Sequence, residues 1–131
     1  MCKSVAGENL TLNNEVSFEA EIIKLILAKK IEVAIENLSK CYGVAIPKIK
    51  VGMPKGRVKK VACYVRHTKT IHFSHQDTLH NPHIVLHEFY HHLRCHGGKH
   101  LGTEKNAEKF AQKFLRAYIL TRKAAFKGSD I

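Results

Sequence analysis

The chain has 131 residues, enough for one domain with its own hydrophobic core and no need of stabilising disulfides. Apolar residues make up 44% of it, an ordinary share for a globular protein, and the longest apolar run is interrupted by a lysine and too short to cross a bilayer. No leader with a cleavage site opens the chain, and its four cysteines are scattered. We therefore expect a cytoplasmic protein with reduced thiols and no membrane contact.

The charge balance is strongly basic. Twenty-two lysines and arginines against eleven acidic residues give a formal net charge of +11. This imbalance favours contact with polyanions such as nucleic acids, although many basic proteins use it only for solubility. Basic residues are frequent at 48–66, which makes that stretch the candidate nucleic-acid contact. All ten histidines, by contrast, lie between His67 and His100.

The first part of the chain is expected to be an arm followed by a helix. Residues 1–16 have no clear period and predict an irregular arm. From Ser17 to about Lys40 apolar residues recur at helical spacing, and Gly43 supplies a stop. No internal repeat or linker follows, so residues 1–131 are expected to form a single domain.

The remaining elements give an α+β pattern. Three short strands are expected at residues 45–52, 58–66 and 70–74, and the turn between the last two is short enough for an antiparallel hairpin. Asn81 and Pro82 then open a helix that Gly97 and Gly98 should end. Thr103 should cap a last helix that runs from Glu104 to about Lys127.

The first of these two helices carries the stretch HEFYH at residues 87–91. At about 100° per residue, His87 and His91 fall on one stripe a single turn apart, with Glu88 beside them and apolar residues on the opposite side. Two imidazoles so spaced can converge on one zinc ion, which lowers the pKa of a bound water toward about 7. We therefore predict His87 and His91 as ligands of one Zn²⁺ per chain, and Glu88 as the general base of a metalloprotease. His92 is expected to be a solvated surface residue.

A catalytic zinc site needs a third protein ligand and an open position. On the last helix, Glu104 falls within the apolar face, where an unpaired carboxylate would be costly, so we expect it to be that ligand. Glu108 borders the same face and is expected to orient one of the histidines from the second shell. His100, beyond the glycine pair, is the alternative ligand, whereas His96 points away from the motif on the same helix.

HEFYH and the later stretch EKNAEKFAQKFL together resemble the gluzincin arrangement, in which His-Glu-x-x-His is completed by a glutamate at the start of a second helix. In scale the chain is most similar to the minigluzincins and to the ImmA/IrrE-type and SprT-like zincin domains. The resemblance covers about residues 17–120. It implies a zincin-like α+β fold with an N-terminal helix, a small three-stranded, mainly antiparallel sheet, an active-site helix and a C-terminal glutamate helix.

The resemblance also carries expectations for the site. It implies zinc ligands at His87, His91 and Glu104, a general base at Glu88, and a strand at 70–74 that pairs with an extended peptide by strand addition. The chain departs from the family in the short connection that follows the motif, and in having Glu108 where Asp or Asn is usual. SprT-like domains use a histidine as third ligand, which leaves His100 open.

Three functions compete at this level. A zinc-dependent endopeptidase acting on a peptide or protein substrate is the leading interpretation. A basic, zinc-containing module that binds nucleic acid or protein without catalysis is the alternative. Histidine-driven metal sequestration is the third, and it predicts several ions per chain where the peptidase predicts one.

Overall fold

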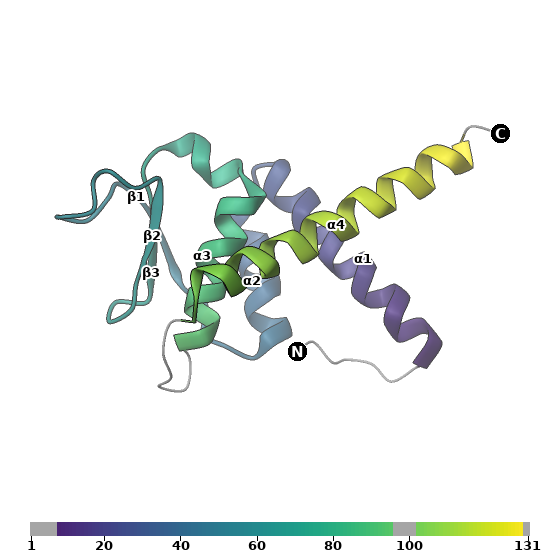
Figure 1. Ribbon diagram of the computed structural model, residues 1–131, viewed down its shortest axis with the longest axis horizontal. Helices are drawn as coiled ribbons and strands as arrows, with labels where there is room; N and C mark the ends of the chain where they lie inside the picture. The colour runs from purple at the N-terminus through teal and green to yellow at the C-terminus, as the bar shows by residue number, and fades with distance from the viewer. Residues whose placement is uncertain (1–7, 96–101, 130–131) are drawn as a thin grey trace.

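The computed structural model describes residues 8–95 and 102–129. These residues form four α-helices, one short 3-10 helix and a three-stranded sheet, which confirms the α+β class. In Figure 1 the sheet lies at one end of the molecule, and α4 crosses both α3 and α1. The elements in chain order are α1 (Glu8–Leu27), α2 (Ile31–Tyr42), β1 (Lys48–Val51), β2 (Ala62–Val65), β3 (Thr70–Phe73), the 3-10 helix (Gln76–His80), α3 (Pro82–Cys95) and α4 (Glu104–Ser129).

Two helices stand where one was predicted. Helix α1 begins at Glu8, so the predicted irregular arm is wrong for residues 8–16, while residues 1–7 lie outside the described part of the chain. The single helix predicted from Ser17 to Lys40 is also wrong, because Lys29 adopts a left-handed backbone with φ 66° and breaks it. The predicted stop at Gly43 is confirmed by its φ of 67°.

The sheet has the order β1-β3-β2. Strands β2 and β3 form the predicted antiparallel hairpin, but β1 pairs with β3 in parallel, so the sheet is mixed and not mainly antiparallel. Because β3 is the central strand, both of its edges are already hydrogen-bonded. The strand addition expected at residues 70–74 is therefore wrong for this sheet. The edge strands are β1 and β2, and of these it is β2 that packs against α3.

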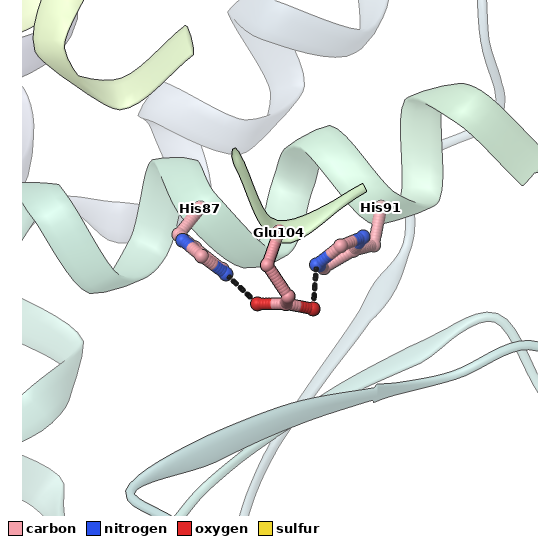
Figure 2. Close-up of side chains that lie close together, drawn as sticks. All are labelled: His87, His91 and Glu104. Carbon is pink, nitrogen blue, oxygen red and sulfur yellow. Dashed lines mark hydrogen bonds and ion pairs between the residues drawn. The ribbon is translucent and has the colours of Figure 1, made fainter. Parts of the chain in front are cut away.

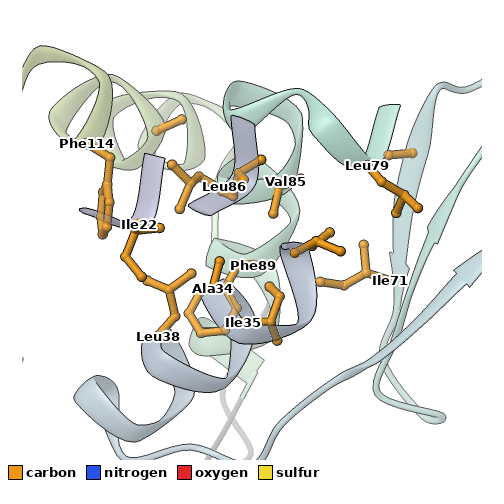
Figure 3. Packing of buried hydrophobic residues seen from close by; sticks show 14 of the residues in the cluster. Ile22, Ala34, Ile35, Leu38, Ile71, Leu79, Val85, Leu86, Phe89 and Phe114 are labelled. Atoms are coloured by element: carbon orange, nitrogen blue, oxygen red, sulfur yellow. The ribbon is translucent and has the colours of Figure 1, made fainter. Parts of the chain in front are cut away.

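One hydrophobic core joins the helices to the sheet (Figure 3). The helices, β2 and β3 contribute buried side chains, among them Ile22, Ile35, Ile71, Phe89 and Phe114, whereas β1 contributes only the partly buried Ile49. Burial of a side chain of this size contributes about 1.5–3 kcal/mol. On α3 the buried residues Val85, Leu86 and Phe89 hold one face of the helix in the core, so the face that carries His87 and Glu88 is turned away from it.

Side-chain caps fix where the last two helices begin, as predicted. The Asn81 side-chain oxygen accepts a hydrogen bond from the backbone N–H of Ile84 at 3.2 Å. The Thr103 hydroxyl accepts one from the backbone N–H of Asn106 at 3.0 Å. The predicted stop at residues 97 and 98 lies outside the described residues.

Two expectations about the environment can be compared with the structure. Cys63 and Cys95 are free thiols, but Cys41 is disulfide-bonded, so the prediction that all four cysteines are reduced is wrong. Among the described residues, no helix combines the length and the apolar character that a membrane span requires.

Candidate metal centre

The carboxylate of Glu104 lies between the rings of His87 and His91 (Figure 2). Its two oxygens make separate contacts, 2.7 Å to Nε2 of His87 and 3.1 Å to Nε2 of His91. One donor atom from each of the three residues lies within 4.8 Å of the other two. The structure thus brings together the three residues that the sequence predicts as metal ligands.

Glu104 reaches the histidines because it is the first residue of α4, which packs across α3. The sequence predicts a carboxylate turned into the core, but the Glu104 side chain is 79% exposed, and that part of the prediction is wrong. The side chain of His91 is 8% exposed and that of His87 18%, so the imidazoles lie on the protein side of the cluster and the exposed Glu104 lies on the solvent side. Ligands from solution can therefore reach the cluster.

Gly102 allows this close approach of the two helices. Its backbone has φ +82°, a left-handed conformation that side-chain-bearing residues rarely adopt. A Cβ atom here would lie 2.7 Å from a ring carbon of Tyr90 and 2.9 Å from Cγ of Arg94, both on α3. The chain therefore passes directly over α3 two residues before Glu104, and only glycine fits.

The charges around Glu104 favour its ionised form. Burial alone would raise its pKa, but the hydrogen bond from His87 and the charges of His91, His87 and Lys60 outweigh this effect, so the pKa of Glu104 is lowered. A carboxylate that stays ionised is ready to bind a cation. Two imidazole nitrogens and one carboxylate oxygen are also the donor set that zinc accepts in catalytic sites.

A second carboxylate lies behind the first histidine. Glu108 bonds Nε2 of His83 at 2.6 Å and accepts a hydrogen bond from Gln112 at 3.1 Å. Its other oxygen lies 3.8 Å from Nδ1 of His87, too far for a direct hydrogen bond but on the side of the ring away from Glu104. The hydrogen bonds from His83 and Gln112 lower the pKa of Glu108, which keeps a negative charge beside His87. The position is the one predicted for a residue that orients a ligand.

Glu88 lines a cleft beside the cluster. The cleft has a volume of about 590 Å³, with His91, Glu104 and Gly102 on one side and β2 on the other. The pKa of Glu88 is raised to about 7, chiefly by burial. The charge of His91 opposes this rise and that of Glu104 adds to it, while Lys60 and Arg57 also oppose it. A carboxyl group with this pKa exchanges its proton near neutral pH, which is what a general base or acid requires.

No protein-family model, no curated protein and no solved structure that was compared with the chain matches it. The assignment of a function therefore depends on the chain's own residues.

The residues present fit a metal ion. The predicted ligands His87, His91 and Glu104 already converge, and small changes of side-chain torsion would bring their donor atoms onto one ion with bonds of about 2.0–2.1 Å. The alternative third ligand, His100, lies outside the described residues. Coordination by the other three does not depend on it.

His92 is one of the residues that the sequence reading misjudged. It is 2% exposed, so the prediction of a solvated surface residue is wrong. The position is seven residues after Val85 and three after Phe89, which places it on the buried face of α3, and this spacing was the signal that could have found it. His83 was also missed, although it lies four residues before His87 on the same stripe.

Proposed function

We propose that the protein is a zinc-dependent peptidase, with one Zn²⁺ held by His87, His91 and Glu104. The observation that carries the proposal is the convergence of these three side chains beside a cleft that also contains Glu88. The same set of residues is what the resemblance to gluzincins implies. A histidine cluster that only stored metal would have no need of a partly buried carboxyl group beside it.

A zinc ion in this position would supply a Lewis acid and a water molecule of lowered pKa, about 7. Glu88 follows His87 directly in the sequence and faces the cleft together with His91. Glu88, partly buried at the edge of the cluster, would take a proton from the attacking water and pass it to the leaving amine. Glu108, whose ionised carboxylate lies 3.8 Å from Nδ1 of His87, would favour the orientation of that ring by its charge.

The free edge of β2 is the part of the cleft that suits a peptide. Residues 62–64 line the cleft, and their strand pairs with one other strand only, β3. Its backbone also accepts a hydrogen bond from the guanidinium of Arg57, at the oxygen of Tyr64. An extended peptide could add to this edge and bring its backbone past Glu88 and His91. This assigns to β2 the role that the resemblance gives to residues 70–74.

The proposal is tested with Glu88→Gln and a matched control, Glu32→Gln. Glu32 is exposed on α2 and does not line the cleft. Zinc content is measured by metal analysis, and cleavage by mass spectrometry on a mixed peptide library. Wild type and Glu32→Gln should hold one zinc and cleave, while Glu88→Gln should hold one zinc and be slower by about 100-fold or more.

Three results would contradict the proposal. Cleavage that survives complete removal of zinc, or is unchanged in Glu88→Gln, would show that these residues do not carry out the reaction. If the wild-type protein holds one zinc but cleaves nothing in the library, the metal centre would be supported and the peptidase function would be rejected.

A further inference from the structure

Side chains of both charges line the cleft. Glu88 and Glu104 come from α3 and α4, as does the histidine cluster. Arg57 and Lys60 come from the segment between β1 and β2. The proposed catalysis uses only the residues of α3 and α4, so the cationic side chains need their own explanation.

The segment that carries Arg57 and Lys60 is held by its own hydrogen bonds. The backbone N–H of Arg57 donates to Pro54 at 3.0 Å, and that of Lys60 donates to the carbonyl of Arg57 at 3.2 Å. Gly56 makes the turn possible with φ 84°. The guanidinium of Arg57 also donates to the backbone oxygen of Tyr64 on β2 at 3.5 Å. These contacts hold the backbone of the segment and the guanidinium of Arg57 at the cleft, with Lys60 beside them.

The side chains of Arg57 and Lys60 are exposed, and within the described part of the chain neither forms an ion pair. Both are near enough to Glu88 for their charges to lower its pKa. With a divalent ion in the cluster, the charges of Glu88 and Glu104 cancel that of the ion. Arg57 and Lys60 then remain as uncompensated positive charges in a partly enclosed space, where electrostatic attraction is stronger than on an open surface.

We propose that Arg57 and Lys60 select peptide substrates that carry an aspartate or glutamate close to the bond that is cleaved. This inference rests on the proposed peptidase function and names its substrate class. A single carboxylate side chain can approach the two cations while the peptide backbone lies along β2. The guanidinium of Arg57 offers the two parallel N–H donors that a carboxylate accepts.

A nucleic acid fits this cleft less well. Its phosphates follow one another closely, whereas among the described residues two Lys/Arg side chains line the cleft, Arg57 and Lys60, which match a single carboxylate better than a run of phosphates. An acidic peptide places one negative charge beside the cations and leaves neutral backbone elsewhere. The basic residues at 48–66 that lie outside the cleft remain a predicted nucleic-acid contact, separate from this inference.

The test uses matched peptides that differ only in one residue, Glu, Gln or Lys, at successive positions around a bond that the wild type cleaves. The variant is Arg57→Glu/Lys60→Glu. Its control is Lys55→Glu/Lys59→Glu, which changes the same charge in the same exposed segment but at residues that do not line the cleft. Binding is measured in parallel by fluorescence anisotropy on zinc-loaded Glu88→Gln protein, with and without the same substitutions.

Wild type and the control should prefer the Glu peptide over the Gln peptide by roughly three- to tenfold in kcat/KM, less at high salt. Arg57→Glu/Lys60→Glu should lose this preference and favour the Lys peptide. Equal cleavage and equal binding of the Glu and Gln peptides by wild type would overturn the inference. So would a loss of the preference for the Glu peptide in Lys55→Glu/Lys59→Glu as large as that in Arg57→Glu/Lys60→Glu. So would a single-stranded oligonucleotide that displaces the Glu peptide from wild type but not from the variant. If the Glu peptide binds preferentially and is not cleaved, the selectivity stands and the peptidase proposal fails.

Discussion

The hydroxyl of Tyr64 lies 2.8 Å from Nδ1 of His92, and this buried contact ties β2 to α3. Burial raises the pKa of Tyr64 to about 12, so its hydroxyl stays protonated and donates the hydrogen bond. On the other side of the ring, Nε2 of His92 donates to the backbone oxygen of Ala45 at 2.7 Å. Both ring nitrogens are thus used inside the protein, and His92 holds the edge strand of the cleft against the helix that carries the motif.

His92→Phe should destabilise the protein by about 1–3 kcal/mol, because it leaves the buried hydroxyl of Tyr64 and the partly buried carbonyl of Ala45 without their hydrogen bonds. Tyr64→Phe should cost about 1–2 kcal/mol, since it removes one bond. The free energy of unfolding is measured in urea. His67→Ala, at an exposed turn, serves as control and should stay within about 0.5 kcal/mol of wild type. If His92→Phe leaves the free energy of unfolding unchanged, the hydrogen bonds of His92 to Tyr64 and Ala45 do not stabilise the cleft.

Gly102→Ala should lower both stability and zinc affinity. The alanine Cβ would meet Tyr90 and Arg94 at 2.7 and 2.9 Å, so the start of α4 must shift away from α3 and take Glu104 with it. The left-handed backbone adds about 1–2 kcal/mol and the crowding about 1–3 kcal/mol. We expect zinc to bind at least about tenfold more weakly, measured by competition with a chelator of known affinity.

Gly43→Ala is the control that separates the cost of backbone strain at a positive φ from the displacement of Glu104. Gly43 has a similar φ of +67° but open space around it, and it does not line the cleft. It should show the backbone cost alone, with zinc affinity unchanged. Equal zinc affinities for both alanine variants would show that the close approach at Gly102 does not set the position of Glu104.

Glu108→Ala should weaken zinc binding by about tenfold while one ion per chain is still bound at saturation, because residues behind a metal ligand typically contribute this much. The control is Lys109→Ala at the neighbouring exposed position. Titration with zinc against a chelator measures both. If Glu108→Ala binds zinc as tightly as the control, the contact at 3.8 Å between Glu108 and His87 has no role in the site.

Metal-free protein should become less stable as the pH rises, through Glu88. Its pKa is raised from 4.5 to about 7 in the folded state, so between these values the folded protein holds more protons than the unfolded chain, and the free energy of unfolding falls with rising pH. Glu88→Gln removes this dependence. In excess chelator, the variant should gain about 2–3 kcal/mol over wild type between pH 5 and pH 8. A constant difference between the two proteins across this range would contradict the raised pKa.

The periodicity of α3 and the caps of α3 and α4 made the candidate site predictable. Residues 87, 88 and 91 could be assigned to one helix face because the opposite face is apolar, and Asn81 and Thr103 mark where the helices start. The contact of Glu104 with the histidines could be proposed from its place at the start of α4. Its exposure could not, because that depends on how α4 crosses α3.

Other features required the three-dimensional structure. The break between α1 and α2 occurs at Lys29, a residue type that rarely adopts a positive φ, and neither glycine nor proline marks it. The parallel pairing of β1 with β3 joins strands that are not neighbours in sequence, so the sequence does not indicate that β3, where the resemblance implies peptide addition, has both edges occupied. Arg57 and Lys60 looked like part of a general basic stretch, because a sequence does not indicate which exposed side chains border a cleft.

Zinc content per chain tests the central claim most directly, measured by metal analysis after dialysis against a weak chelator on wild type, Glu104→Ala and His100→Ala. We predict one zinc in wild type and in His100→Ala, and loss of zinc from Glu104→Ala, because Glu104 contacts both His87 and His91. One tightly held zinc in Glu104→Ala, with loss in His100→Ala, would contradict this coordination. A wild-type protein that holds no zinc, or several ions, would contradict the metal centre itself.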